Sequence, residues 1–67
     1  MSTKSYSGKE FCRLLEQHGW QLKRTKGSHH IYGKPGELAL LVVPVHANRA
    51  LKPGLQHKLI KLARLPE

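Results

Sequence analysis

Hydrophobic residues near the start of the chain recur at helical spacing. Positions i, i+3, i+4 and i+7 of this stretch are held by Phe11, Leu14, Leu15 and His18. The spacing predicts an amphipathic helix with one apolar stripe. We expect it to begin near Gly8, because Ser7 and Glu10 form an S-x-x-E capping box, in which each side chain binds the backbone N–H of the other residue. Gly19 closes the helix with a left-handed residue, and we expect the His18 ring to pack at its C-terminal end.

A two-residue alternation replaces the helical spacing after Gly19. Trp20, Leu22 and Arg24 alternate with Gln21, Lys23 and Thr25, at the two-residue period of a half-buried strand. Residues 26–28 are expected to form a turn, and a second short strand is expected from His29 to Gly33. We predict that these two strands pair as an antiparallel hairpin.

The longest apolar run, residues 38–45, predicts a third strand. It is rich in β-branched residues and too short to span a membrane, which favours a well-buried strand. A type II turn precedes it, with Pro35 and Gly36 at the two central positions. Pro44 cannot donate a ladder hydrogen bond, so it ends the strand or places it at a sheet edge. The three strands are expected to form an antiparallel meander.

A second helix is expected to begin near Pro53, where the missing N–H of proline costs nothing. Its apolar arc holds Leu55, Leu59, Leu62 and Ala63, and its outer, basic arc holds His57, Lys58, Lys61 and Arg64. The order α-β-β-β-α predicts an α+β fold in which both helices cover one face of a three-stranded antiparallel sheet. We expect one domain over residues 1–67, with residues 1–6 flexible.

The charge balance points to an acidic partner. Twelve Lys and Arg residues against four Asp and Glu residues give a net charge of +8 on 67 residues. Such a balance predicts a polyanion or an acidic protein as the binding partner. A single cysteine, Cys12, excludes an internal disulfide and is expected to be a buried, inert thiol. We expect no membrane association and a cytoplasmic protein.

The most informative stretch is the first hairpin. Lys23, Arg24 and Lys26 stand immediately before Gly27-Ser28-His29-His30. An imidazole can give and take protons near neutral pH, and nearby cations can hold a phosphate and stabilise the charge that develops on it. The alternative is a polar hairpin whose two histidines are merely solvated.

A metal site is not expected in this hairpin. His29 and His30 are adjacent on a strand, so their side chains point to opposite faces and are poor ligands for one ion. The chain has no H-E-x-x-H or C-x-x-C motif and only four scattered carboxylates. We therefore expect neither metal nor cofactor. His46 is either a second acid or base or a loop anchor, and Trp20 and Tyr32 are expected in the core rather than as platforms for bases.

Four segments of the chain together resemble a known family. They are Ser7-Gly8-Lys9-Glu10, then Leu14-Leu15-Glu16 before Gly19-Trp20, then Arg24-x-x-Gly27-Ser28-His29-His30-Ile31-Tyr32, and Val43-Pro44-Val45-His46-x-Asn48 leading to Leu51-Lys52-Pro53-Gly54. In this order and spacing they look like the HicA family of toxin mRNA interferases, over residues 7–65. The resemblance implies a fold similar to the double-stranded-RNA-binding domain, which agrees with the order predicted above.

The resemblance also implies an activity and a site. It implies a metal-independent endoribonuclease that cleaves mRNA and is neutralised by an acidic antitoxin, HicB. The catalytic histidine of the family falls on His29, and the glycine that shapes its turn falls on Gly27, with Ser28 completing that turn. Alternation along the strand would then direct His30 and Tyr32 toward the helices and leave His29 on the opposite face of the sheet, which the helices do not cover.

Two other functions remain open at this point. The chain could be a non-catalytic RNA-binding module of the same topology, although only one lysine, Lys52, marks the start of its last helix. It could also be an interaction protein that only meets an acidic partner. RNA contacts are predicted at Lys23, Arg24, Lys26, Lys58, Lys61 and Arg64. Ala39, Leu41 and Val43 are expected to make the open face of the sheet partly apolar, which favours a homo-oligomer or a toxin–antitoxin hetero-oligomer.

Overall fold

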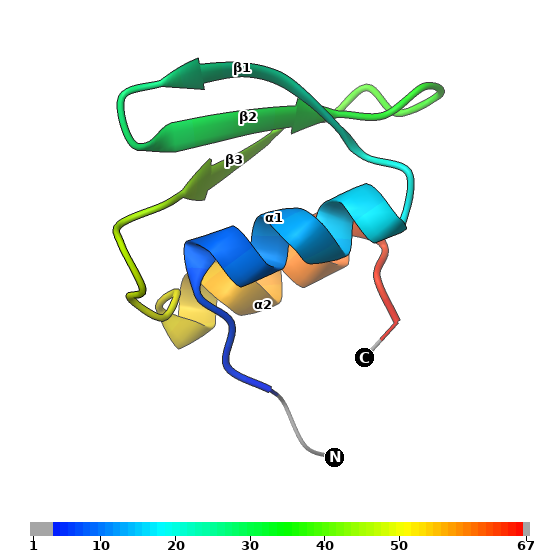
Figure 1. The fold of residues 1–67 in the computed structure, drawn as a ribbon. Helices are drawn as coiled ribbons and strands as arrows, with labels where there is room; N and C mark the ends of the chain where they lie inside the picture. The colour runs from blue at the N-terminus through cyan, green and yellow to red at the C-terminus, as the bar shows by residue number, and fades with distance from the viewer. Residues whose placement is uncertain (1–3, 67) are drawn as a thin grey trace.

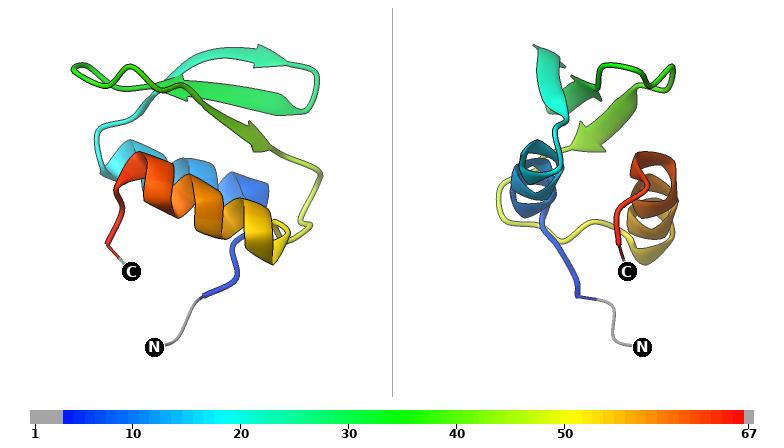
Figure 2. Two further views of the ribbon diagram at one scale, coloured as in Figure 1. Left: turned by 180° about the vertical axis from the view of Figure 1, so that it is seen from behind. Right: turned by 90° about the vertical axis from the view of Figure 1, so that its right-hand side faces the viewer.

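The chain forms one helix, three strands and a second helix, in that order, and these elements pack in two layers (Figure 1). The computed structural model describes residues 4–66. Its elements are α1 (Gly8–Gln17), β1 (Gln21–Lys26), β2 (His29–Gly33), β3 (Leu41–Pro44) and α2 (Pro53–Ala63). The strands form an antiparallel sheet in the order β1-β2-β3. Both helices lie side by side on one face of the sheet (Figure 2), which confirms the predicted fold class.

Helix α1 begins with the predicted capping box. The Glu10 N–H donates to Ser7 Oγ at 3.1 Å, and the Ser7 N–H donates to Glu10 Oε1 at 3.0 Å. The backbone N–H of Ser7 is the main reason why the pKa of Glu10 is lowered. Gly19 has the expected left-handed φ of +91°. The expected packing of His18 is wrong: the helix ends at Gln17, so His18 is its cap residue and turns into solvent.

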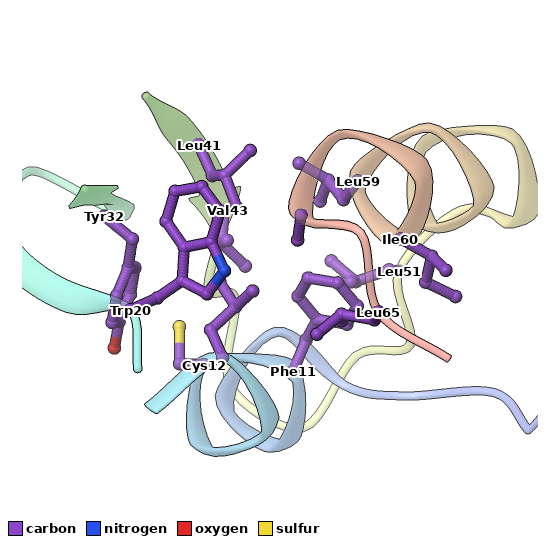
Figure 3. Close-up of a cluster of buried hydrophobic side chains, with 12 residues drawn as sticks. Phe11, Cys12, Trp20, Tyr32, Leu41, Val43, Leu51, Leu59, Ile60 and Leu65 are labelled. Carbon is purple, nitrogen blue, oxygen red and sulfur yellow. The ribbon is translucent and has the colours of Figure 1, made fainter. Parts of the chain in front are cut away.

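The core lies between the two helices and the sheet (Figure 3). Trp20 and Tyr32 are 2% and 1% exposed, so the prediction that they are core residues is confirmed. Cys12 is buried beside them, and this burial raises the pKa of its thiol. On α2 the predicted apolar arc is partly wrong, because Leu62 is 43% exposed while Ile60 is buried.

The third strand is shorter than predicted. Only Leu41–Pro44 pair with β2, whereas Leu38 and Leu40 are exposed. The pairing begins where Tyr32 lies opposite Leu41, and β2 ends one residue beyond Tyr32. β2 is therefore too short to pair with the apolar residues that precede Leu41. Pro44 ends β3 as predicted.

The first strand is exposed over its whole length, so the prediction of a half-buried strand is wrong. β1 lies at the edge of the sheet, and its helix-side residue Leu22 stays 47% exposed although it pairs with buried Tyr32. One face of β1 is not covered at all. An edge strand of this kind is free to present its side chains to a partner.

The segment after β3 is fixed against the start of α1 and the residues before it. A Cβ placed on Gly8 would lie 2.9 Å from Val45 Cα, so only glycine permits this approach of helix and strand end. The Leu51 N–H donates to the Tyr6 carbonyl at 2.8 Å, and the Tyr6 N–H donates to Gln56 Oε1 at 2.9 Å. Of the expected flexible stretch 1–6, residues 1–3 lie outside the described residues.

Candidate active site

A β-bulge in β1 determines which cations share a face. Leu22 pairs with Tyr32 and Arg24 pairs with Ile31, so Lys23 is an extra residue in the ladder. Simple alternation would place Lys23 and Arg24 on opposite faces of the sheet. A bulge sets two residues against one and re-aims their side chains.

Contacts at Gly33 show where the bulge directs Lys23. Gly33 follows buried Tyr32 on β2, so a Cβ placed on it would point away from the helices. That Cβ would lie 3.0 Å from Lys23 Cε and 3.2 Å from Leu40 Cδ2. Both side chains are therefore on the uncovered face of the sheet. Arg24 is on the same face, because its partner Ile31 precedes Tyr32 and alternates with it.

We call this uncovered surface the open face. Its side chains include those of Gln21, Lys23, Arg24, Lys26, His29, Ile31, Leu40, Val42 and Pro44. The three cations lie along β1, and the aliphatic residues lie on β2, on β3 and just before β3. Lys26 is paired with His29, so the cationic row ends beside an exposed imidazole.

His29 is held by the turn that precedes it. Gly27 and Ser28 connect β1 to β2, and Gly27 has a φ of +60°, as the first central residue of a type II′ hairpin turn does. A Cβ on Gly27 would meet nothing within 4 Å, so the backbone conformation rather than space calls for glycine. On its other side His29 pairs with Pro44 of β3. The backbone of His29 is thus paired with a neighbouring strand on each side, and this pairing fixes the position from which the imidazole projects.

The side chains of His29 and His30 lie on opposite faces of the sheet, as strand alternation predicts. His30 is half-buried and lies opposite buried Val43, whereas His29 is exposed. Tyr32, two residues beyond His30, is buried and donates from its hydroxyl to Glu16 Oε2 at 2.7 Å. Burial and this hydrogen bond raise the pKa of Tyr32 far above its usual value. His30 therefore shares the helix side of the sheet with Tyr32.

His46 lies at the same end of the sheet as His29. The Val45 N–H donates to the Ser28 carbonyl at 2.7 Å, so the chain leaving β3 still follows the hairpin turn. His46 comes next and is exposed. This placement brings the exposed imidazoles of His29 and His46 to one end of the sheet, and His46 stays a candidate for the second acid or base.

The basic residues of α2 are not brought together with His29. Lys58, Lys61 and Arg64 are exposed on the helix layer, which covers the other face of the sheet (Figure 2). Arg64 also lies 3.9 Å from Glu37, measured from Nη1 to Oε2. RNA that contacts both basic surfaces would have to pass around the edge of the molecule.

The predicted apolar part of the open face is wrong for two of its three residues, Leu41 and Val43. Leu41 and Val43 are completely buried, because they lie opposite Tyr32 and His30 on the helix side. The neighbouring residues Leu40 and Val42 are 61% and 44% exposed instead. Strand alternation could have found them once Tyr32 was assigned to the core, since that assignment determines the face of every paired residue on β3.

Two further observations concern metals and membranes. Within residues 4–66, no three His, Cys, Asp or Glu side chains come together as a group that could hold a metal ion. In the same part of the chain, neither helix has the length and apolar character needed to cross a bilayer.

Comparison with known families decides the classification. A family model described as the HicA toxin of bacterial toxin–antitoxin systems matches residues 8–65. The chain belongs to the HicA toxin family. No curated protein sequence matches it significantly. As a HicA toxin, it is the toxin component of a toxin–antitoxin system and has an antitoxin as its partner.

Proposed function

We propose that this HicA toxin is a metal-independent endoribonuclease that cleaves mRNA with His29 as its acid–base catalyst. The observation that carries the proposal is the position of exposed His29 at the end of the cationic row on the open face. RNA is a polyanion, and an uncovered sheet face with three cations offers its phosphates a binding surface. Because mRNA is the substrate, the site of action is the cytoplasm.

The proposed reaction uses the 2′-hydroxyl of the RNA itself. The His29 imidazole accepts the proton of a ribose 2′-OH while the oxygen attacks the adjacent phosphorus. The bond from phosphorus to the 5′ oxygen breaks, and that oxygen takes up a proton from a second acid, for which His46 is our candidate. The products are a 2′,3′-cyclic phosphate and a free 5′-OH. DNA has no 2′-OH and is expected to bind without being cut.

The cations of β1 supply the electrostatic part of catalysis. One positioned acid or base contributes about 10²–10⁴-fold in rate, which is a small part of what most enzymes achieve. Lys23, Arg24 and Lys26 lie on the same face as His29 and can stabilise the additional negative charge on the phosphorane. Lys26 is directly opposite His29 in the ladder and is the nearest of the three along the sheet.

The open face is also the proposed binding surface of the antitoxin. It combines the cations of β1 with exposed Leu40 and Val42. An acidic, HicB-like antitoxin would be attracted by the net charge of +8 and would desolvate the aliphatic side chains on contact. A partner in this position covers His29, so inhibition follows from steric exclusion of RNA.

Incubation of the purified toxin with end-labelled RNA in excess EDTA tests the proposed activity. We expect cleavage that leaves 2′,3′-cyclic phosphate ends, and no cleavage of DNA of the same sequence. Cleavage that requires added Mg²⁺ would contradict the imidazole mechanism. RNA binding without any cleavage would identify a non-catalytic RNA-binding module instead.

A further inference from the structure

A pocket of about 300 Å³ adjoins the proposed active site at the β3–α2 connection. It is lined by Pro44, His46, Arg49, Ala50, Leu51, Lys52 and Leu55. One of these lining residues, Pro44, pairs with His29 in the sheet. The pocket therefore begins at the strand that neighbours the proposed catalytic residue. Its volume is at the lower end of the range of about 300–1,000 Å³ for small-molecule sites.

The walls of the pocket are fixed by backbone hydrogen bonds. The Arg49 N–H donates to the His46 carbonyl at 3.0 Å and closes a turn, in which Ala47 takes a positive φ of 50°. Ala50 forms a β-bridge with Ser7, and Leu51 is bonded to the Tyr6 carbonyl as described above. The connection is thus tied to the start of the chain on one side and to the hairpin turn on the other.

The lining combines an apolar floor with a cationic rim. Leu51 is 6% exposed and Leu55 is half-buried, so both form part of the floor. His46, Arg49 and Lys52 are exposed around it, and no carboxylate is among the lining residues. The Lys52 side chain makes no capping hydrogen bond at the start of α2. A nucleotide fits this combination, because the floor and the imidazole can contact the faces of its aromatic base while the cations bind its phosphate.

We propose that this pocket binds the RNA nucleotide next to the scissile phosphate, with its base on the floor beside His46 and its phosphate between Arg49 and Lys52. The location next to the scissile bond rests on the proposed ribonuclease function. The pocket borders the open face at Pro44 and determines which phosphate of a single RNA strand lies at His29. A single-stranded substrate is required, because a paired base is not free to enter the pocket.

Binding of a non-cleavable RNA tests the pocket apart from catalysis. The probe is a fully 2′-O-methylated decanucleotide of mixed sequence, titrated against the toxin by fluorescence anisotropy. We expect the double variant Arg49→Gln, Lys52→Gln to lower the affinity about tenfold. The slope of log affinity against log salt should decrease by about 0.7 for each phosphate that is no longer neutralised. The matched control is Lys9→Gln, Lys34→Gln, which removes the same charge outside the pocket and should change the affinity by less than about threefold. Equal losses in both double variants would overturn the proposal, since they would show only the effect of net charge.

His46 provides a second test that separates stacking from proton transfer. If the ring stacks on the base, His46→Phe should bind the probe almost as wild type does and His46→Ala should bind it several-fold more weakly. Equal weakening by both substitutions would contradict the stacking role. For cleavable RNA, the pocket variants Arg49→Gln and Lys52→Gln should raise KM with little change in kcat.

The outcomes distinguish this proposal from the ribonuclease function. Probe binding that depends on Arg49 and Lys52, in a protein that does not cleave RNA in EDTA, would retain the pocket and reject the catalytic proposal. Normal cleavage together with pocket variants that behave like the Lys9, Lys34 control would reject the pocket alone. Loss of antitoxin affinity without loss of probe affinity would assign the pocket to the protein partner and would also reject it as a nucleotide site.

Discussion

The Tyr32 hydroxyl donates a hydrogen bond of 2.7 Å to the Glu16 carboxylate and ties the middle strand of the sheet to α1. Tyr32 is 1% exposed, so its ring cannot move to the open face without leaving a large cavity. Because strand side chains alternate, the same contact holds His29, three residues earlier, on the opposite side of the sheet. The orientation of the proposed catalytic residue therefore depends on a buried contact on the far face.

We expect Tyr32→Phe to lower the free energy of unfolding by about 1–2 kcal/mol, because it removes a hydrogen bond to a charged acceptor but keeps the ring. Glu16 is exposed and can be solvated instead. RNA cleavage should be retained, since the ring still determines the strand orientation. Urea unfolding measures the change, with Tyr6→Phe as the control; its ring packs edge-to-face on Phe11 at 5.9 Å and is kept. Stability of Tyr32→Phe equal to that of wild type would show that the hydrogen bond contributes nothing.

Alkaline pH should destabilise the toxin through Cys12. Burial raises the pKa of its thiol above the usual value of 9.0, so the folded protein keeps a proton that the unfolded chain releases. The stabilisation is complete below about pH 9 and is lost as the pH rises toward the pKa of the folded state. We expect the free energy of unfolding, measured in urea between about pH 8 and 10, to fall with pH in wild type. Cys12→Ala should show a shallower fall, and identical slopes would contradict the assignment.

His29→Ala should lower the rate of RNA cleavage by about 10²–10⁴-fold. His29 is exposed, so the fold and the affinity for non-cleavable RNA should stay close to those of wild type. Circular dichroism and anisotropy verify both properties on the same sample. His18→Ala is the matched control, because it removes another exposed imidazole, one that lies on the helix layer. A folded His29→Ala protein with most of its activity would exclude the catalytic assignment.

The parts of the fold that could be predicted from the sequence are those with local causes. Three features lie where the sequence predicts them: the capping box at Ser7, the left-handed Gly19 and the proline at the start of α2. Each depends only on residues within a few positions of it along the chain. The divergence of His29 and His30 could also be predicted, because β2 is regular from His29 onward.

The errors arise where one strand depends on another. The bulge at Lys23 appears only in the pairing of β1 with β2, and a periodicity analysis that assumes strict alternation cannot detect it. The end of β3 depends on the length of β2, and the face of Leu41 depends on its pairing with Tyr32. The predicted turn at residues 26–28 is wrong at Lys26, which is the last residue of β1 and pairs with His29. The joint orientation of Lys23 and Arg24 could not be predicted either, because it depends on the bulge.

Two glycines near helix starts should respond to alanine in opposite directions. Gly8→Ala would force a methyl group against the backbone of Pro44 and Val45, which cannot rotate away, and we expect a loss of about 1–3 kcal/mol. A Cβ on Gly54 would meet nothing within 4 Å. Gly54→Ala should therefore stabilise the protein by about 0.4–1 kcal/mol through the entropy of the unfolded chain. Thermal and urea unfolding measure both, and destabilisation by both substitutions would show that the close approach at Gly8 is not the cause.

Charge reversal on β1 should weaken RNA cleavage and antitoxin binding together. The triple variant Lys23→Glu, Arg24→Glu, Lys26→Glu replaces three positive charges with negative ones on the open face, so the net charge falls from +8 to +2. We expect the antitoxin affinity to fall by at least tenfold at fixed ionic strength, because each close like-charge contact with an acidic partner is unfavourable.

The control for this experiment makes the same change in net charge on α2, at Lys58, Lys61 and Arg64. These residues are our second predicted RNA contact, so the α2 variant should lower RNA affinity as well. They lie on the helix layer, away from the open face, so its antitoxin affinity should stay within a few-fold of wild type. Titration of the antitoxin against both variants decides the question. An unchanged antitoxin affinity in the β1 variant would show that inhibitor and RNA use different surfaces, and an equal loss in both variants would show that the antitoxin responds to net charge rather than to the open face.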